Sequence, residues 1–160
     1  MNTSFINLFD EKIMKVGLEA ENAQDIILQL GELMAARGFV EATYGKDVFE
    51  REKSFPTGLP TQPFAVAIPH ADPDHVIISS IAIGVLQDPI IFQQMGSGGA
   101  IELSVPLVFM LALKDFKQQT AVIRDLITMI QNKDLLQSIL EAQSAEEIHA
   151  VLVKTDTTNH

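Results

Sequence analysis

The sequence has 160 residues, of which 47% are apolar and 20% charged, a balance that predicts one globular domain with a substantial core. The net charge of -10 argues against nucleic-acid binding, which needs clustered Lys and Arg, and the absence of cysteine excludes disulfides, thiolate metal sites and cysteine nucleophiles. No apolar run reaches the roughly 20 residues that cross a bilayer, and the N-terminus lacks a signal-peptide pattern, so we expect a cytoplasmic protein without direct membrane insertion.

The first periodic segment begins near Asn22 and predicts a helix. Asn22 is a candidate N-cap, and Asp25 follows three residues later, near the positive end of the helix dipole. Gly38 provides a stop signal, and a second, shorter helix is predicted over residues 46–53. The apolar residues that recur at helical spacing in the first helix are Ile26, Ile27, Leu30, Leu33 and Met34.

The middle of the chain predicts short strands separated by turns. Residues 54–63 hold three prolines and a glycine, which favour a loop over a helix or a central strand. Asp88-Pro89 predicts a turn between two strands, and the glycine cluster at residues 96–99 predicts a flexible turn. The predicted strands cover residues 64–68, 80–86, 90–92 and 105–113.

The last third of the chain is predicted to be helical, over residues 118–131 and 134–142 and from Ser144 onward. Glu147 lies three residues after Ser144, which is capping-box spacing. Residues 155–160 are assigned to a flexible tail, so residues 1–154 form the domain. Helices before, between and after the strands predict a single-domain α/β fold whose sheet is covered on both faces.

The four histidines of the chain occupy different settings. His70 directly follows the 64–68 strand and a proline, at the carboxyl end of a strand, where α/β proteins gather ligand and catalytic groups. This position makes His70 a functional candidate, with a satisfied structural histidine as the alternative. His75 is expected to be a solvated loop histidine, and His149 to have a surface or interface position on the last helix. His160, the last residue, is expected to have no role.

Charged residues around His70 allow two further hypotheses. Arg51 could balance the charge of a phosphoryl group, although its spacing alone favours a solvated helix end. The pattern formed by His70, Asp72, Asp74 and His75 invites a metal site. It lacks helical His-x-x-x-His spacing, however, and Asp-Pro-Asp is equally typical of a turn, so we predict neither a metal nor a cofactor.

Three short motifs occur in order along the chain: Arg51-Glu52, Thr57-Gly58-Leu59 and Ala67-Ile68-Pro69-His70. Together they resemble the signature of the fructose/mannitol-type enzyme IIA domains of the bacterial phosphotransferase system, and the similarity covers roughly residues 5–153. The resemblance implies a mixed β-sheet of about five strands flanked by helices, and a phosphotransferase that carries phosphate on His70. Ala-Leu-Lys-Asp at residues 112–115, followed by glutamine, is more similar to galactitol-type members.

The resemblance also implies partners. Family members accept phosphate from the histidine of the small carrier HPr and pass it to a cysteine of the cognate IIB component, with the membrane component IIC downstream. The absence of cysteine from this chain agrees with that division of labour. A regulatory, nitrogen-type IIA uses the same histidine chemistry but signals by binding target proteins, and the sequence leaves this alternative open.

The resemblance assigns a role to each motif. A neutral imidazole nitrogen of His70, which the family suggests to be Nε2, attacks the phosphoryl group while the other nitrogen is held as a donor. Arg51 would stabilise the phosphoryl charge, and Glu52 belongs to the same binding motif. Thr57 and Gly58 would shape the loop over His70, with the glycine permitting a backbone geometry that a side chain would forbid.

Many family members carry a second histidine at the start of the helix after the central strand. In this chain Gln119 takes that place, with Gln118 as a one-residue alternative. A glutamine amide can donate a hydrogen bond to a phosphoryl oxygen but cannot carry a proton or a positive charge. We therefore expect His70 to be the only titrating group of the site, with Arg51 as its charged partner.

Overall fold

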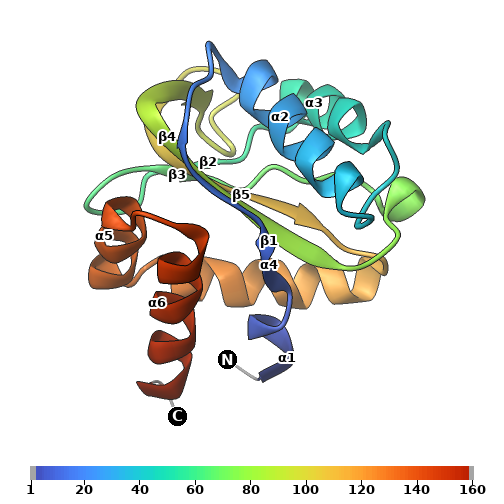
Figure 1. Cartoon of the computed structure of the whole chain (residues 1–160). Coiled ribbons are helices and arrows are strands. Elements are labelled where there is room, and N and C mark those ends of the chain that lie inside the picture. The colour runs from blue at the N-terminus through green and yellow to red at the C-terminus, as the bar shows by residue number, and fades with distance from the viewer. Residues whose placement is uncertain (1–2, 159–160) are drawn as a thin grey trace.

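The computed structural model describes residues 3–158 and shows a five-stranded mixed sheet between two helical layers (Figure 1). The strand order is β1-β4-β5-β3-β2, in which β1 pairs with β4 and β5 with β3 in parallel, and the other pairs are antiparallel. The predicted fold, a mixed sheet of about five strands with helices on both faces, is confirmed.

The elements follow one another closely along the chain. The strands are β1 (Phe9–Leu18), β2 (Gly58–Leu59), β3 (Val66–Ala67), β4 (Ser80–Gln93) and β5 (Glu102–Ala112). The helices are α1 (Thr3–Ile6), α2 (Ala23–Ala36), α3 (Tyr44–Ser54), α4 (Phe116–Met129), α5 (Lys133–Glu141) and α6 (Ala145–Thr158), with a short 3-10 turn η1 (Pro73–His75) before β4.

Side-chain caps mark the helix starts that the sequence predicts. Oδ1 of Asn22 accepts a hydrogen bond from the Asp25 N–H at 2.9 Å and begins α2. Oγ of Ser144 accepts from the Glu147 N–H at 3.2 Å and begins α6. This helix continues through Thr158, so helical structure extends into the segment assigned to a flexible tail; residues 159–160 lie outside the described range.

The strand β1 is missing from the sequence prediction, which was wrong to place the first regular element near Asn22. β1 lies at the edge of the sheet, and its pairing with β4 shifts register twice. Only Phe9, Ile13 and Met14 are buried among its ten residues, so no regular alternation marks it. Pairing with β4, more than 60 residues away, creates this strand.

The predicted turn at Asp88-Pro89 is also wrong, because β4 runs without a break from Ser80 to Gln93. Its pairing with β5 shifts register between Val85 and Ile90, and Pro89 lies within that irregularity. A proline, which has no backbone N–H to donate, is tolerated at such an irregular position of a strand. The predicted 64–68 strand is only two residues long, and the 54–63 loop contains β2.

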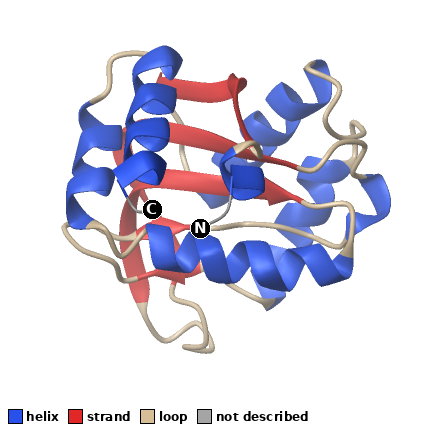
Figure 2. Cartoon of the chain, turned by 90° about the horizontal axis from the view of Figure 1, so that it is seen from below, coloured by secondary structure: helices blue, strands red, loops and turns tan. Residues whose placement is uncertain are grey.

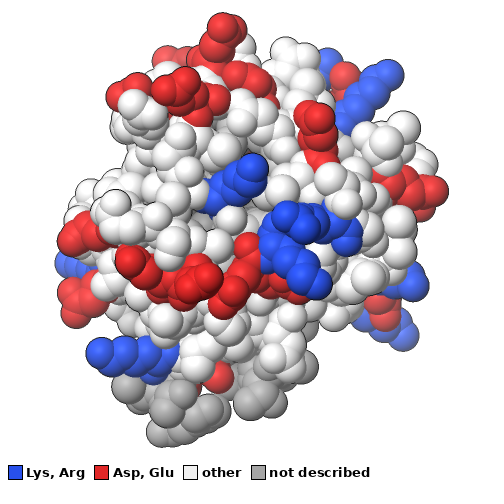
Figure 3. All heavy atoms as spheres, viewed as in Figure 1, with Lys and Arg blue, Asp and Glu red and all other residues white. Residues whose placement is uncertain are grey.

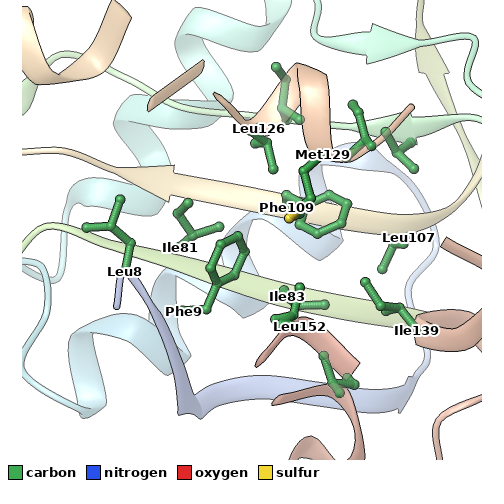
Figure 4. Close-up of a cluster of buried hydrophobic side chains, with 14 of the residues drawn as sticks. Leu8, Phe9, Ile81, Ile83, Leu107, Phe109, Leu126, Met129, Ile139 and Leu152 are labelled. Atoms are coloured by element: carbon green, nitrogen blue, oxygen red, sulfur yellow. The ribbon is translucent and has the colours of Figure 1, made fainter. Parts of the chain in front are cut away.

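Alternate side chains of the two central strands build a core on each face of the sheet. Figure 4 shows the core that the sheet forms with α4, α5 and α6, and the view from below in Figure 2 shows helices of this layer lying over the strands. The opposite core lies under α2 and α3. On the first face lie Ile81, Ile83, Leu107 and Phe109, and on the second Ala82, Val108 and Met110.

The helices α2 and α3 approach closely at two glycines. A Cβ atom on Gly31 would lie 2.6 Å from the Cα atom of Gly45, so a side chain at this position must push the helices apart. We expect Gly31→Ala to lower the free energy of unfolding by about 1–3 kcal/mol, measured by urea denaturation. Glu32→Ala, at the exposed neighbouring position, should change it by less than about 0.5 kcal/mol, and equal values for both variants would contradict the prediction.

Candidate functional site

His70 follows β3 and is 9% exposed. Its Nδ1 atom lies 2.8 Å from the carbonyl oxygen of Ile68. Because a carbonyl oxygen can only accept, Nδ1 carries the ring proton, and the lone pair is on Nε2. The backbone at the end of β3 therefore sets both the tautomer and the orientation of the imidazole.

The surroundings of His70 favour its neutral form. Burial lowers the pKa of the imidazole below its ordinary value of 6.5, and the positive charge of Arg51 acts in the same direction. The hydrogen bond to Ile68 and the charge of Asp72 oppose this shift without cancelling it. Neutral imidazole is the nucleophilic form, so His70 can attack an electrophile at neutral pH.

Glu52 is linked to the His70 segment by hydrogen bonds that pass through Thr57 and the backbone of Ile68. Its two carboxylate oxygens accept from the N–H of Thr57 at 2.9 Å and from Oγ1 of Thr57 at 2.8 Å, and both residues are buried. The Thr57 carbonyl in turn accepts from the Ile68 N–H at 3.2 Å. A Cβ on Gly58 would lie 2.6 Å from the Gln93 carbonyl oxygen, so only glycine allows this loop to pack so closely.

The ionisation of Glu52 predicts a pH dependence of stability. Burial raises its pKa from 4.5 to about 7, although both hydrogen bonds from Thr57 favour the carboxylate. Because the folded state has the higher pKa, its stabilisation by the extra proton is present at low pH and is lost as the pH rises from 4.5 to about 7. Glu52→Gln should remove a decline on the order of 1–3 kcal/mol across this window.

Urea unfolding of wild type and Glu52→Gln across that pH window measures this decline. The difference between the two curves isolates Glu52, since His70 titrates in both proteins. Glu50→Gln alters an exposed carboxylate on the same helix and should keep the wild-type slope. A wild-type slope in Glu52→Gln would contradict the raised pKa.

Arg51 lies beside the His70 segment without a close ion pair. Its Nη1 atom is 3.8 Å from Oδ1 of Asp72, and its guanidinium lies 4.9 Å from the centre of the Phe55 ring. Its Nε is buried and has no hydrogen-bond partner among the described residues. The side chain is partly exposed and its ion pair with Asp72 is long, so the terminal nitrogens of the guanidinium, and not the buried Nε, can donate to an anion. It lines an open pocket of about 250 Å³ with Asp47, Glu50, Ala71, Asp72, Asp74 and His75.

The two glutamines at the start of α4 have different partners. Gln119 donates from Nε2 to the Ala71 carbonyl at 3.1 Å, next to His70 in the chain. Gln118 accepts from Oγ of Ser79 at 3.0 Å. Of the two alternatives that the sequence left open, Gln119 is therefore the one in contact with the His70 segment.

Comparison with known proteins identifies the family of this chain. Residues 7–155 match the family model described as "Phosphoenolpyruvate-dependent sugar phosphotransferase system, EIIA 2". The chain belongs to this EIIA family. It is thus an EIIA component, a phosphotransfer protein of the sugar phosphotransferase system, and the resemblance seen in the sequence is confirmed.

One curated relative and two solved structures illustrate what this chain is similar to. The galactitol-specific EIIA component of Escherichia coli K12 is 28% identical over 134 residues, which cover 84% of this chain and 85% of the relative. Two solved structures share the fold. IIA-Ntr from Neisseria meningitidis has a TM-score of 0.76 at 23% identity, covering 94% of this chain and 99% of that chain. Enzyme IIAMTL in complex with phosphorylated IIBMTL from Escherichia coli has a TM-score of 0.74 at 21% identity, covering 92% and 99%.

The other histidines of this EIIA protein lie outside the His70 contacts. His75 contacts the carboxylate of Asp47 through Nδ1, and this hydrogen bond raises the pKa of His75. His149 on α6 has Nδ1 at 3.2 Å from Oε1 of Glu11 on β1, and His160 lies outside the described range. Within residues 3–158, no three His, Asp or Glu side chains are grouped to hold a metal, so the metal hypothesis gains no support.

Sequence reasoning missed Tyr44 and Asp47, which contact the segment around His70 from α3. Tyr44 donates to the Leu111 carbonyl and accepts from the Ala71 N–H, partners that lie 67 and 27 residues away. A buried tyrosine normally needs a partner for its hydroxyl, but no local pattern names partners at such separations. The only signal available was that Tyr44 is the one tyrosine of the chain.

The surface of this EIIA protein carries more acidic than basic side chains. On the face that Figure 3 shows, Asp and Glu are widely spread, and Lys and Arg form a few smaller groups. None of the helices described over residues 3–158 is both long and apolar enough to cross a membrane.

Proposed function

We propose that this EIIA protein accepts a phosphoryl group on Nε2 of His70 from phospho-HPr and donates it to a cysteine of a cognate IIB component. The observation that carries this proposal is the contact between Nδ1 of His70 and the Ile68 carbonyl, which leaves the Nε2 lone pair available. The buried ring is neutral at neutral pH and therefore nucleophilic.

The transfer balances without any group beyond the two histidines and the thiolate. The Nε2 lone pair of His70 forms a bond to phosphorus as the nitrogen–phosphorus bond of phospho-HPr breaks. A thiolate of IIB then attacks the same phosphorus, and the imidazole leaves as neutral His70. The Arg51 guanidinium neutralises the charge that spreads over the phosphoryl oxygens during both steps. Gln119 contributes position and hydrogen bonding but no proton.

Exposed apolar side chains around the site support docking of protein partners. Phe55 is 61% exposed and lies against Arg51. Phe116 is 59% exposed and begins α4, three residues before Gln119, while Ile78 is 51% exposed beside Ser79, the partner of Gln118. Large exposed apolar groups near polar ones are typical of surfaces that bind proteins.

The relatives support a proposal for the substrate of the transport pathway. The match to a galactitol-specific EIIA component supports uptake of galactitol or a similar sugar alcohol, with a membrane IIC component downstream. The complex of IIAMTL with phosphorylated IIBMTL, which shares the fold, supports a IIB component as acceptor. Transfer between such partners takes place in the cytoplasm, where we place this protein.

Incubation with phosphoenolpyruvate, enzyme I and HPr tests the proposal. We expect intact-mass measurement to show one acid-labile phosphoryl group, which is lost when a galactitol-type IIB protein is added. No uptake from phospho-HPr would overturn the proposal. Uptake without transfer to IIB, together with binding of a regulatory protein by the unphosphorylated form, would instead support a nitrogen-type regulatory IIA, whose fold this chain shares.

A further inference from the structure

We infer that Tyr44 is a positioning residue for phosphoryl transfer, because its hydroxyl clamps the backbone beside His70 to the end of β5. The inference rests on the proposed role of His70. Tyr44 is the first residue of α3 and is fully buried. Its hydroxyl donates to the Leu111 carbonyl at 2.6 Å and accepts from the Ala71 N–H at 3.2 Å. Both hydrogen-bonding capacities of this hydroxyl are thus used by the backbone.

The clamp acts on both sides of His70. The Leu111 N–H donates to the Pro69 carbonyl at 3.0 Å, so the residue before His70 is tied directly to β5. The residue after His70, Ala71, is tied to the same residue of β5 through the Tyr44 hydroxyl. Without that hydroxyl, the Ala71 N–H and the Leu111 carbonyl lose this shared partner.

Other contacts from α3 to this segment are more exposed. Tyr44, Asp47 and Arg51 lie on one face of the helix, at spacings of three and four residues. Asp47 contacts His75, and Arg51 faces Asp72 at 3.8 Å, but all four of these side chains are at least 34% exposed. Only Tyr44 holds the backbone from a dry environment, where a hydrogen bond is stronger than in water.

The chemistry of Tyr44 suits a permanent clamp. Burial raises the pKa of its phenol well above the ordinary value of 10, so the hydroxyl keeps its proton and its donor role at every pH at which the protein functions. In-line transfer depends on placing Nε2 of His70 correctly, and a displacement of about 1 Å can lower a rate by roughly 100-fold. The clamp acts on position, since the Tyr44 hydroxyl donates to the Leu111 carbonyl and accepts from the Ala71 N–H, both of them backbone groups.

Tyr44→Phe removes only the hydroxyl and tests the inference. We expect kcat for transfer from phospho-HPr to fall by at least about 10-fold while KM for phospho-HPr stays unchanged, because the docking surface is intact. Val48→Ala is the matched control: it lies on the same helix, is fully buried and makes a cavity without removing a hydrogen bond from the backbone beside His70. A wild-type kcat in Tyr44→Phe, or an equal loss in Val48→Ala, would overturn the inference.

A second measurement needs no variant. Because Tyr44 is the only tyrosine in the chain, tyrosine-labelled protein gives a single hydroxyl resonance. We expect this proton to exchange slowly with solvent in both the free and the phosphorylated protein, since the clamp must persist through the cycle. Fast exchange in either form would overturn the inference. Failure of the wild type to accept phosphate would instead count against the proposed function.

Discussion

His70→Ala is expected to accept no phosphoryl group from phospho-HPr, a loss at the limit of detection. The proposed nucleophile is Nε2 of His70, and Gln119, which contacts the same segment, has no basic nitrogen that could replace it. Intact-mass measurement after incubation with phosphoenolpyruvate, enzyme I and HPr checks this result. Circular dichroism and urea unfolding should show that the variant is still folded.

The matched control for this loss is His75→Ala. His75 lies five residues further along the same segment and bonds to Asp47, outside the contacts of the His70 ring. The His75→Ala variant should become phosphorylated to the same extent as the wild type. A phosphoryl group retained in His70→Ala, or lost in His75→Ala alone, would contradict the assignment of the nucleophile.

Arg51→Ala is expected to slow phosphoryl transfer by roughly 100-fold or more while the protein stays folded. Removing one preorganised donor from a developing oxyanion typically has an effect of this size. The stability change should stay below about 1 kcal/mol, because the side chain is 38% exposed and its ion pair with Asp72 is long. Rapid-quench measurement of transfer from phospho-HPr gives the rate, and urea unfolding gives the stability.

Two further variants test whether the effect of Arg51→Ala comes from a specific contact or from net charge. Arg51→Lys should recover only part of the rate, because an ammonium supplies charge without the planar pair of donors. Lys53→Ala removes an exposed positive charge two residues away and should transfer at a rate within about two-fold of wild type. Equal losses in Arg51→Ala and Lys53→Ala would mean that net charge, and not a specific contact, assists transfer.

Elements specified by neighbouring residues were predictable from the sequence. The caps at Asn22 and Ser144 act over three residues, and residues 105–112 of β5 form a nearly continuous apolar run, so the local pattern was sufficient. The strand β1 and the unbroken course of β4 were not predictable. Both depend on pairing with distant strands, which overrides local polarity in β1 and accommodates Pro89 in β4.

The sequence by itself determined the family, through three ordered motifs that end at His70, and the confirmed α/β fold. Only the tertiary structure decided how these residues meet. It left Nε2 of His70 free by pairing Nδ1 with Ile68, brought Gln119 into contact with the Ala71 carbonyl, and brought Tyr44 against the Ala71 N–H. The physical reason is that a sequence motif specifies residue types within a short stretch of chain and carries no information about contacts with distant residues. Burial and hydrogen bonding in this site join groups from α3, β5 and α4, which are close only once the sheet has formed.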